Sequence, residues 1–212
     1  NDYPPVKVGL IGLGTVGGGV TRVLARNAGE ISRRAGREII ITHAAARSLD
    51  TIIANTAGMK LTGEALEVVD DPEVTIIVEL MGGYEPARSL VLRALENGKH
   101  MVTANKALIA RHGNEIFAAA HAAERMVGFE AAVAGGIPII KAIREGLAGN
   151  RIEWVAGIIN GTANFILSEM RDKGRDFARA LAEAQVLGYA EADPTFDIEG
   201  IDAAHKLTIL AS

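Results

Sequence analysis

The feature that most constrains the fold of this sequence is a glycine-rich turn between an apolar run and a helical pattern. Residues 6–11 are mostly apolar, and Gly12, Gly14 and Gly17 follow at the spacing Gly-x-Gly-x-x-Gly. Beyond the turn, apolar residues recur at the period of a helix. A strand, a tight turn and a helix in this order are typical of a loop that holds the phosphates of a dinucleotide at a helix N-terminus. The alternative is a plain glycine-rich turn between a strand and a helix.

The three glycines would have different roles in such a loop. Gly12 allows the tight turn, Gly14 lets the backbone approach a pyrophosphate, and Gly17 lets the helix pack on the strand. An acidic residue would bind the ribose of NAD at the end of the second strand, but the sequence has Arg47 there. Because an arginine can face the 2′-phosphate of NADP, the sequence favours NADP over NAD. The alternative interpretation of Arg47 is a solvated charge at a strand end.

Strands and helices alternate along the first part of the chain. Apolar or β-branched runs predict strands at residues 38–46, 75–80 and 100–103, and helices are predicted at 86–97 and 106–125, with a polar stretch at 27–37. This alternation predicts an α/β fold, a Rossmann-type parallel sheet with helices on both faces. Ligands of such sheets bind outside the carboxyl ends of the strands, so we expect Lys106 to lie near a nicotinamide.

The pattern changes after about residue 130, which predicts a cofactor-binding domain at residues 1–130 and a substrate domain at 131–212. A glycine-rich bend opens a helix through Leu147. The second domain is predicted to be part of an α+β fold, with a strand at residues 151–159 and helices at 163–171, at 177–187 and from about Gly200. The sequence ends at Ser212 inside a helical pattern, so we expect the substrate domain to continue beyond it.

The composition excludes several classes of protein. The chain has no cysteine, which removes disulfides, thiolate zinc sites and cysteine nucleophiles and suits a reducing, cytoplasmic setting. Its net charge of -4, without a basic block, argues against nucleic acid as a partner. No apolar run approaches the roughly 20 residues that span a bilayer. We therefore expect a cytoplasmic protein with neither nucleic acid nor membrane among its partners.

Charged residues crowd into a short segment near the end of the sequence. They are Glu191, Asp193, Asp197, Glu199, Asp202 and Lys206, and Gly188 and Tyr189 lie beside them. On a helix that starts near Gly200, Asp202 and Lys206 are four residues apart and share one face. The plain interpretation is a surface pair worth about 0.2–0.5 kcal/mol. If the lysine lies in a closed cleft, it can instead donate a proton to a carbonyl oxygen during hydride transfer, and the carboxylates would suit a substrate with an ammonium group.

Several motifs, in order, resemble the homoserine dehydrogenase family. They are GLIGLGTVG at residues 9–17, ELMGG at 79–83, TANKA at 103–107, NGTANFIL at 160–167, GYAEADP at 188–194 and GIDAAHK at 200–206. The resemblance extends over essentially the whole chain. It implies the reversible, NAD(P)-dependent interconversion of L-homoserine and L-aspartate 4-semialdehyde, in the branch that leads to threonine and methionine.

The resemblance also implies roles for the residues at matching positions. Lys206 would donate and accept the proton at the reacting oxygen, with Asp202 beside that oxygen and Lys106 as a second active-site lysine. The substrate would contact Glu191 through its ammonium group, Asp197 as a supporting carboxylate, and Gly161, Thr162 and Tyr189. The cofactor would contact Gly12, Gly14, Thr15, Val16, Gly17, Arg47, Ser48, Lys106 and Gly188.

The same resemblance implies a cation site and a dimer. Glu130 and the main-chain oxygens of Val133, Gly135 and Ile137 would bind a monovalent cation such as sodium, whereas the plain interpretation of this segment is a connecting bend. We expect a homodimer. The alternatives are a non-catalytic nucleotide-sensing module, which would lack the lysine and acid residues found here, and an NADP oxidoreductase that acts on a different semialdehyde.

Overall fold

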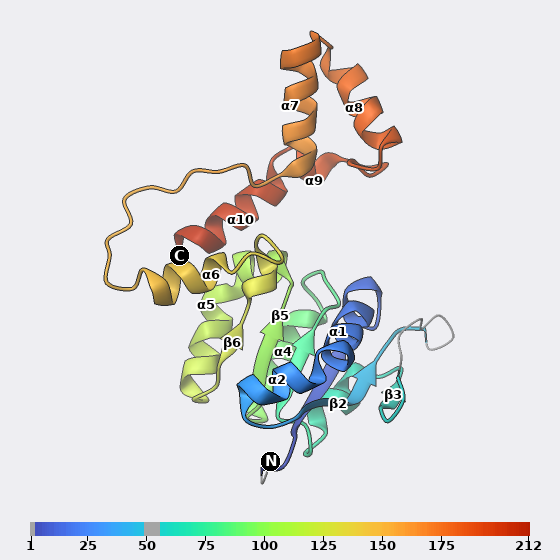
Figure 1. Cartoon of the computed structure of the whole chain (residues 1–212), viewed down its shortest axis with the longest axis vertical. Coiled ribbons are helices and arrows are strands. Elements are labelled where there is room, and N and C mark those ends of the chain that lie inside the picture. The colour runs from blue at the N-terminus through green and yellow to red at the C-terminus, as the bar shows by residue number, and fades with distance from the viewer. Residues whose placement is uncertain (1–2, 49–55) are drawn as a thin grey trace. The chain divides into compact units, whose positions relative to one another are not determined.

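The computed structural model describes residues 3–48 and 56–212 and divides the chain into two compact units, Asn1–Gly135 and Gly136–Ser212 (Figure 1). The first unit contains a sheet with helices. The second unit contains helices and one long open segment.

The first unit is built on a six-stranded sheet with the strand order β3-β2-β1-β4-β5-β6. The strands are β1 (Val6–Ile11), β2 (Ile39–Ala45), β3 (Lys60–Thr62), β4 (Ile76–Glu79), β5 (His100–Thr103) and β6 (Val127–Gly128). Each neighbouring pair is parallel. The chain runs outward from β1 to β3 and then returns to place β4 beside β1, which is the strand order of a Rossmann fold. The Rossmann-type sheet predicted from the sequence is confirmed.

Helices cover both faces of the sheet, because each parallel connection requires a crossover. On one face, α1 (Thr15–Arg26) and α2 (Ala28–Ala35) pack over β2 (Figure 1). On the other face, α3 (Ala65–Asp70), α4 (Ala87–Glu96) and α5 (Lys106–Ala122) lie side by side. A short 3-10 helix, η2 (Glu130–Ala132), follows β6.

The alternation of side chains along β1 explains how both helix layers approach it. Leu10 is fully buried and belongs to a core cluster against which Val20 and Leu24 of α1 pack. Gly9 points to the opposite face, where a Cβ atom would lie 2.6 Å from Val68 Cγ1 of α3. The absent side chain therefore lets α3 lie directly on the backbone of the central strand.

Several short elements were not predicted from the sequence. Within the polar stretch at 27–37, residues 28–35 form α2, along which Glu30 binds Arg33 at 2.8 Å and Arg34 at 2.6 Å. None of the residues of α2 is buried, so the helix has no apolar stripe that a sequence pattern could reveal. β3 and β6, at the two edges of the sheet, are only three and two residues long, too short for a visible alternation.

The second unit begins with α6 (Ile139–Lys141) and a π-helical turn, η3 (Ala142–Gly146). After the open segment come α7 (Gly161–Lys173), α8 (Phe177–Val186), α9 (Thr195–Ile198) and α10 (Ile201–Ala211). α7 and α8 lie side by side, with Ile166, Ala180 and Ala184 buried between them (Figure 1). None of the helices in residues 3–48 and 56–212 is both long and apolar enough to cross a membrane.

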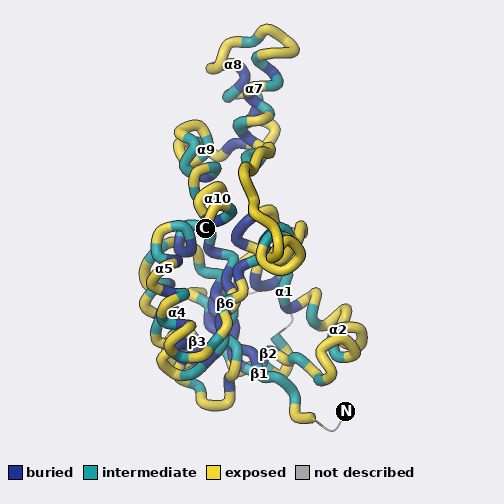
Figure 2. Tube along the Cα trace, turned by 90° about the vertical axis from the view of Figure 1, so that its left-hand side faces the viewer, coloured by how far each residue is buried: buried dark blue, intermediate teal, exposed yellow. Residues whose placement is uncertain are grey.

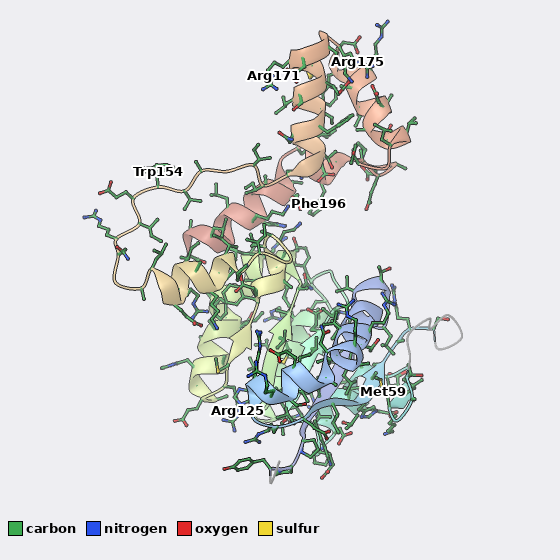
Figure 3. The ribbon with its side chains drawn as sticks, viewed as in Figure 1. Met59, Arg125, Trp154, Arg171, Arg175 and Phe196 are labelled. Atoms are coloured by element: carbon green, nitrogen blue, oxygen red, sulfur yellow. The ribbon has the colours of Figure 1, made fainter. Side chains whose placement is uncertain are left out.

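The strand predicted at residues 151–159 is wrong. Within residues 136–212, all of which the structure describes, no strand is present with which this segment could pair. Trp154 and Ile158 are each 78% exposed, and Figure 2 shows the segment exposed along most of its length. Trp154 projects from it (Figure 3). Because the backbone groups of a strand need a neighbouring strand for their hydrogen bonds, an apolar pattern alone does not form one.

Candidate functional site

Close backbone contacts shape the glycine turn at the end of β1. Gly12 has a φ of +104°, and a Cβ atom there would lie 2.8 Å from the carbonyl oxygen of Leu80. A Cβ atom on Gly17 would lie 2.0 Å from the carbonyl oxygen of Gly12. For Gly14, by contrast, no atom of the described residues other than its neighbours in the chain lies within 4 Å of the Cβ position. The fold therefore requires Gly12 and Gly17, whereas Gly14 borders open space.

The start of α1 is suited to bind an anion. Gly14 precedes the helix in an extended conformation, no described side chain caps it, and its first turn holds no acidic residue. Thr15 and Val16 are exposed there. The N–H groups of a first helical turn have no partner within the helix and carry the positive end of its dipole. With the open space at Gly14, this arrangement fits the pyrophosphate of a dinucleotide.

Arg47 and Ser48 follow β2 at the same edge of the sheet. β2 ends at Ala45, whose carbonyl oxygen accepts a hydrogen bond of 2.9 Å from the N–H of Gly12. Arg47 and Ser48 are both exposed. An arginine thus stands just beyond the strand that adjoins the glycine turn, and its selection of a 2′-phosphate stays a prediction.

A buried carboxyl group joins the ends of β4 and β5. Glu79 is fully buried. Its Oε1 accepts hydrogen bonds from the backbone N–H of Met81 at 2.7 Å and of Gly82 at 3.3 Å, and its Oε2 accepts one from the hydroxyl of Thr103 at 2.7 Å. Glu79 therefore holds the loop after β4 against the end of β5. The sequence interpretation did not single it out, although an acid within an apolar strand is a signal for such a role.

Asn105 positions the start of α5, where Lys106 is the first residue. Its side-chain oxygen accepts a hydrogen bond of 3.1 Å from the N–H of Leu108, which caps the helix. Its amide group donates to the carbonyl oxygen of Gly83 at 2.7 Å. The loop after β4 and the N-terminus of α5 are thus tied together, and Lys106 lies at the carboxyl edge of the sheet.

In the second unit, Lys206 and Asp202 form a partly buried pair on α10. Lys206 Nζ lies 2.8 Å from Asp202 Oδ2, and the two side chains are only 23% and 12% exposed. Lys206 Nζ also donates to the carbonyl oxygen of Ile159 at 2.5 Å. The pair predicted from the i,i+4 spacing is therefore present, and it is shielded from solvent instead of lying on an open surface.

Asn160 joins this pair to a second carboxylate. Its Nδ2 donates to Asp197 Oδ1 at 2.7 Å and to Asp202 Oδ2 at 3.0 Å. Asp197 lies on α9, which contacts α10 through the rings of Phe196 and His205, whose centres lie 5.9 Å apart. The sequence interpretation did not name Asn160 as a site residue. An asparagine directly before a predicted helix is a signal for a cap, but not for these contacts.

The residues predicted to line the substrate pocket include a second connection in this unit. Gly161 is the first residue of α7, and the hydroxyl of Thr162 donates to the carbonyl oxygen of Tyr189 at 2.6 Å. The rings of Tyr189 and Phe165 lie 4.9 Å apart. Gly188, with a φ of +77°, makes the turn that precedes Tyr189. α7 and the loop after α8 are therefore held together at this point.

The acidic loop that follows is more exposed. Glu191 is exposed, and its backbone carbonyl accepts a hydrogen bond of 3.1 Å from Gln185. The hydroxyl of Thr195 donates to Asp193 at 2.6 Å, and this bond, with that from the N–H of Thr195, lowers the pKa of Asp193 below its usual value. The binding of a substrate ammonium by Glu191 stays a prediction.

The residues proposed to bind a cation lie around the division between the two units. Glu130 begins η2, Val133 is buried, and Gly135 is the last residue of the first unit. Ile137, in the second unit, is 60% exposed. The cation site is not tested by this structure.

Comparison with protein families gives the same match in both units. Residues 12–130 match the family profile described as "Homoserine dehydrogenase, NAD binding domain". Residues 138–212 match the profile described as "Homoserine dehydrogenase". Among named relatives, the homoserine dehydrogenase of Pseudomonas aeruginosa is 67% identical over 98% of this chain, and that of Neisseria gonorrhoeae is 59% identical over the same share. The alignments cover 48% of each relative, so the chain spans about half the length of these proteins.

Solved structures agree with this similarity. A homoserine dehydrogenase from Thiobacillus denitrificans matches with a TM-score of 0.93 and 70% identity, over 98% of this chain and 48% of that one. A hyperthermophilic archaeal homoserine dehydrogenase in complex with NADPH matches with a TM-score of 0.85 and 28% identity, over 98% of this chain and 69% of that one. The similarity therefore includes both the sheet and the helical unit.

Proposed function

Because the chain belongs to the homoserine dehydrogenase family, we propose that this protein catalyses the reversible, NAD(P)-dependent interconversion of L-homoserine and L-aspartate 4-semialdehyde. The observation that carries the proposal is the shielded pair of Lys206 and Asp202, with Nζ and Oδ2 2.8 Å apart. A carbonyl reduction requires a proton at the oxygen, and a lysine held by a carboxylate is a suitable source.

The first unit supplies the cofactor site in this proposal. The backbone of Gly12, Gly14, Thr15, Val16 and Gly17 would hold the pyrophosphate, and Arg47 and Ser48 would bind the adenosine ribose and its 2′-phosphate. Lys106 and Gly188 would complete the cofactor contacts. Two observations support this assignment, the open space at Gly14 and the uncapped first turn of α1. We propose NADP as the preferred cofactor because Arg47 stands where NAD-binding loops have an acid.

The second unit supplies the proton and the substrate contacts. A bound nicotinamide would supply or accept the hydride at the substrate carbon. During reduction Lys206 donates a proton from Nζ to the carbonyl oxygen, and during oxidation it takes that proton back from the hydroxyl. Asp202 orients Lys206 by accepting its hydrogen bond. The negative charge that develops on the oxygen is stabilised by the ammonium group.

The substrate itself carries an ammonium group that needs an anionic partner. We assign Glu191 to bind it, with Asp197 as the supporting carboxylate. Gly161, Thr162 and Tyr189 would line the pocket, and the hydrogen bond from Thr162 to the carbonyl of Tyr189 supports a fixed wall there. These assignments rest on the positions that match the family motifs.

Three further properties belong to the same proposal. Glu130 and the main-chain oxygens of Val133, Gly135 and Ile137 offer only oxygen donors, which suit a monovalent cation such as sodium. We also propose that the protein is a homodimer. We propose a cytoplasmic location as well, because the chain has no cysteine and therefore needs no oxidising compartment.

The proposal is tested by homoserine-dependent reduction of NADP and of NAD, followed by the absorbance of the reduced nicotinamide. The 212-residue chain and the full gene product are measured side by side. Turnover with homoserine, faster with NADP, is the expected result. Cofactor binding without turnover of homoserine by the full gene product would instead favour a nucleotide-sensing module, and turnover of another semialdehyde would favour a different oxidoreductase.

A further inference from the structure

We propose that Asn160 is a positioning residue, which holds the carboxylate of Asp202 and thereby the ammonium group of Lys206 in the geometry that proton transfer requires. The inference rests on the proposed function of Lys206. It deepens that function, because it adds a residue that touches neither the cofactor nor the reacting atoms.

The amide group of Asn160 bridges two carboxylates. Its Nδ2 donates to Asp197 Oδ1 at 2.7 Å and to Asp202 Oδ2 at 3.0 Å, so both of its hydrogens are used. The carboxylates come from α9 and α10, whereas Asn160 lies at the start of α7. A neutral donor between two like charges keeps them together at a distance at which they would otherwise repel each other.

Asn160 and Lys206 donate to the same atom, Asp202 Oδ2. Lys206 Nζ also donates to the carbonyl oxygen of Ile159, the residue directly before Asn160. The ammonium group of Lys206 is therefore held at two points. One is Asp202 Oδ2, to which Asn160 also donates, and the other is the carbonyl oxygen of Ile159, next to Asn160 in the chain. Because Asp202 is only 12% exposed, water has little access with which to replace the amide donor.

The side-chain oxygen of Asn160 has a separate, structural role. It accepts a hydrogen bond of 2.7 Å from the N–H of Ala163 and so caps α7. Aspartate and serine also cap helices well, but neither can donate two hydrogen bonds to neighbouring carboxylates. Substitution of Asn160 by either residue therefore keeps the cap of α7 but removes the pair of hydrogen bonds to Asp197 and Asp202.

The test compares Asn160→Asp and Asn160→Ser with the unchanged full gene product. Asp176→Asn is the matched control, because Asp176 caps α8 through a bond of 2.9 Å from the N–H of Arg179 and asparagine caps equally well. Thermal melting, the binding of NADPH by fluorescence, and kcat and KM for homoserine are measured for each. We expect kcat to fall by about tenfold to a hundredfold in both Asn160 variants, while NADPH affinity holds. The melting temperature should stay closer to that of the unchanged protein in Asn160→Ser, because Asn160→Asp brings a third carboxylate to Asp197 and Asp202. The control should match the unchanged protein.

A cap without a positioning role predicts a different result. In that case Asn160→Asp and Asn160→Ser retain full kcat, and this outcome would overturn the inference. If one Asn160 variant melts at a lower temperature, the kcat of the other variant decides the inference, because the two substitutions differ in charge and size.

A second readout keeps the inference separate from the proposed function. In the full gene product labelled with ¹⁵N-lysine, the Nζ signal of Lys206 is identified by its loss in Lys206→Met. We expect Asn160→Ser, which adds no charge, to shift this signal, and Asp176→Asn to leave it in place. An unmoved Lys206 signal refutes the positioning role even if the protein fails to oxidise homoserine, whereas a shifted signal without turnover refutes only the proposed reaction.

Discussion

Glu79 and Thr103 lie opposite each other on β4 and β5, and the hydroxyl of Thr103 donates to Glu79 Oε2 at 2.7 Å. The same hydroxyl accepts a hydrogen bond of 2.9 Å from the N–H of Asn105. Both side chains are buried, with exposed fractions of 0% and 1%. One hydroxyl therefore connects a buried carboxyl group to the cap of α5, at the edge of the sheet where Rossmann folds bind their ligands.

Replacing Thr103 with valine should destabilise the first unit. Thr103→Val leaves Glu79 Oε2 and the N–H of Asn105 without their partner, which should lower the free energy of unfolding by about 2–3 kcal/mol. Thr103→Ser keeps the hydroxyl and loses one methyl group, worth about 1 kcal/mol. Urea denaturation followed by far-UV circular dichroism gives both values. Full stability of Thr103→Val, which keeps the shape of threonine, would mean that the hydroxyl contributes nothing beyond its packing.

The glycine turn predicts opposite outcomes for two alanine substitutions. Gly17→Ala places a Cβ atom 2.0 Å from the carbonyl oxygen of Gly12, so it should lower the free energy of unfolding by about 1–3 kcal/mol or more. Gly14→Ala meets no described atom within 4 Å and should change stability by less than about 0.5 kcal/mol. It should nevertheless weaken NADPH binding, measured by fluorescence, because the methyl group occupies the space proposed for the pyrophosphate. Normal NADPH affinity in Gly14→Ala would argue against that location.

Arg47→Ala should weaken NADP more than NAD. Loss of a charged hydrogen bond to the 2′-phosphate should lower NADP affinity by about tenfold to a hundredfold, with little effect on NAD. Arg37→Ala is the control. Arg37 lies just before β2, at the amino ends of the parallel strands and so away from the glycine turn, and its Cζ is 5.3 Å from the centre of the Tyr3 ring. Isothermal titration calorimetry measures the affinity of each variant for NADP and for NAD. An equal loss for NADP and NAD would show that Arg47 does not read the phosphate.

Lys206→Met should abolish proton transfer while cofactor binding persists. Removal of a general acid and base lowers kcat by about 10²–10⁴-fold. Lys141→Met is the control, since the Lys141 side chain is 68% exposed on α6 and has no part in the proposed chemistry. The kcat for homoserine oxidation and the dissociation constant of NADPH are measured for both. If Lys206→Met turns over normally, another group supplies the proton.

Stability should fall in acid partly because of Asp71. Burial raises the pKa of its carboxyl group, but hydrogen bonds from the N–H of Glu73 and from His43 outweigh this and lower the pKa overall. The folded pKa thus lies below the unfolded value of about 3.9, so this contribution is present above about pH 4 and is lost as the pH falls through the folded pKa.

The measurement is the free energy of unfolding of Asp71→Asn between pH 7 and pH 3. We expect the free energy of unfolding of Asp71→Asn to be about 1 kcal/mol below that of the unchanged protein at pH 7, and this difference to become smaller toward pH 3. Asp172→Asn is the control, because Arg171 lowers the pKa of Asp172 on an exposed helix surface, where such pairs contribute little. A loss that stays constant with pH would mean that ionisation of Asp71 is not involved.

The pattern of the sequence predicted the elements that carry their own signal. β1 follows from its apolar run, α1 from the glycine turn and the helical period after it, and α4 and α5 from their periodic segments. α2 has no buried residue and therefore no such signal. The segment at 151–159 shows the opposite case, since it has the composition of a strand but no neighbour in the described chain.

The contacts in the candidate site also fall into two groups, those that the sequence pattern predicted and those that it could not. Asp202 and Lys206 were predicted to meet because four residues on a helix return to one face. The contacts of Asn160 with Asp197 and Asp202 could not be predicted, because α7, α9 and α10 are brought together only by tertiary packing.

The sequence by itself determined the Rossmann-type sheet, the places of the three glycines and the family of the chain, because strand and helix periods and motif spacings are local properties. Only the tertiary structure decided that the carbonyl oxygen of Ile159 also holds Lys206, that Asn160 bridges two carboxylates, and that Glu79 and Thr103 meet. Hydrogen bonds extend over about 3 Å, so residues far apart in the chain form them only after packing fixes their positions.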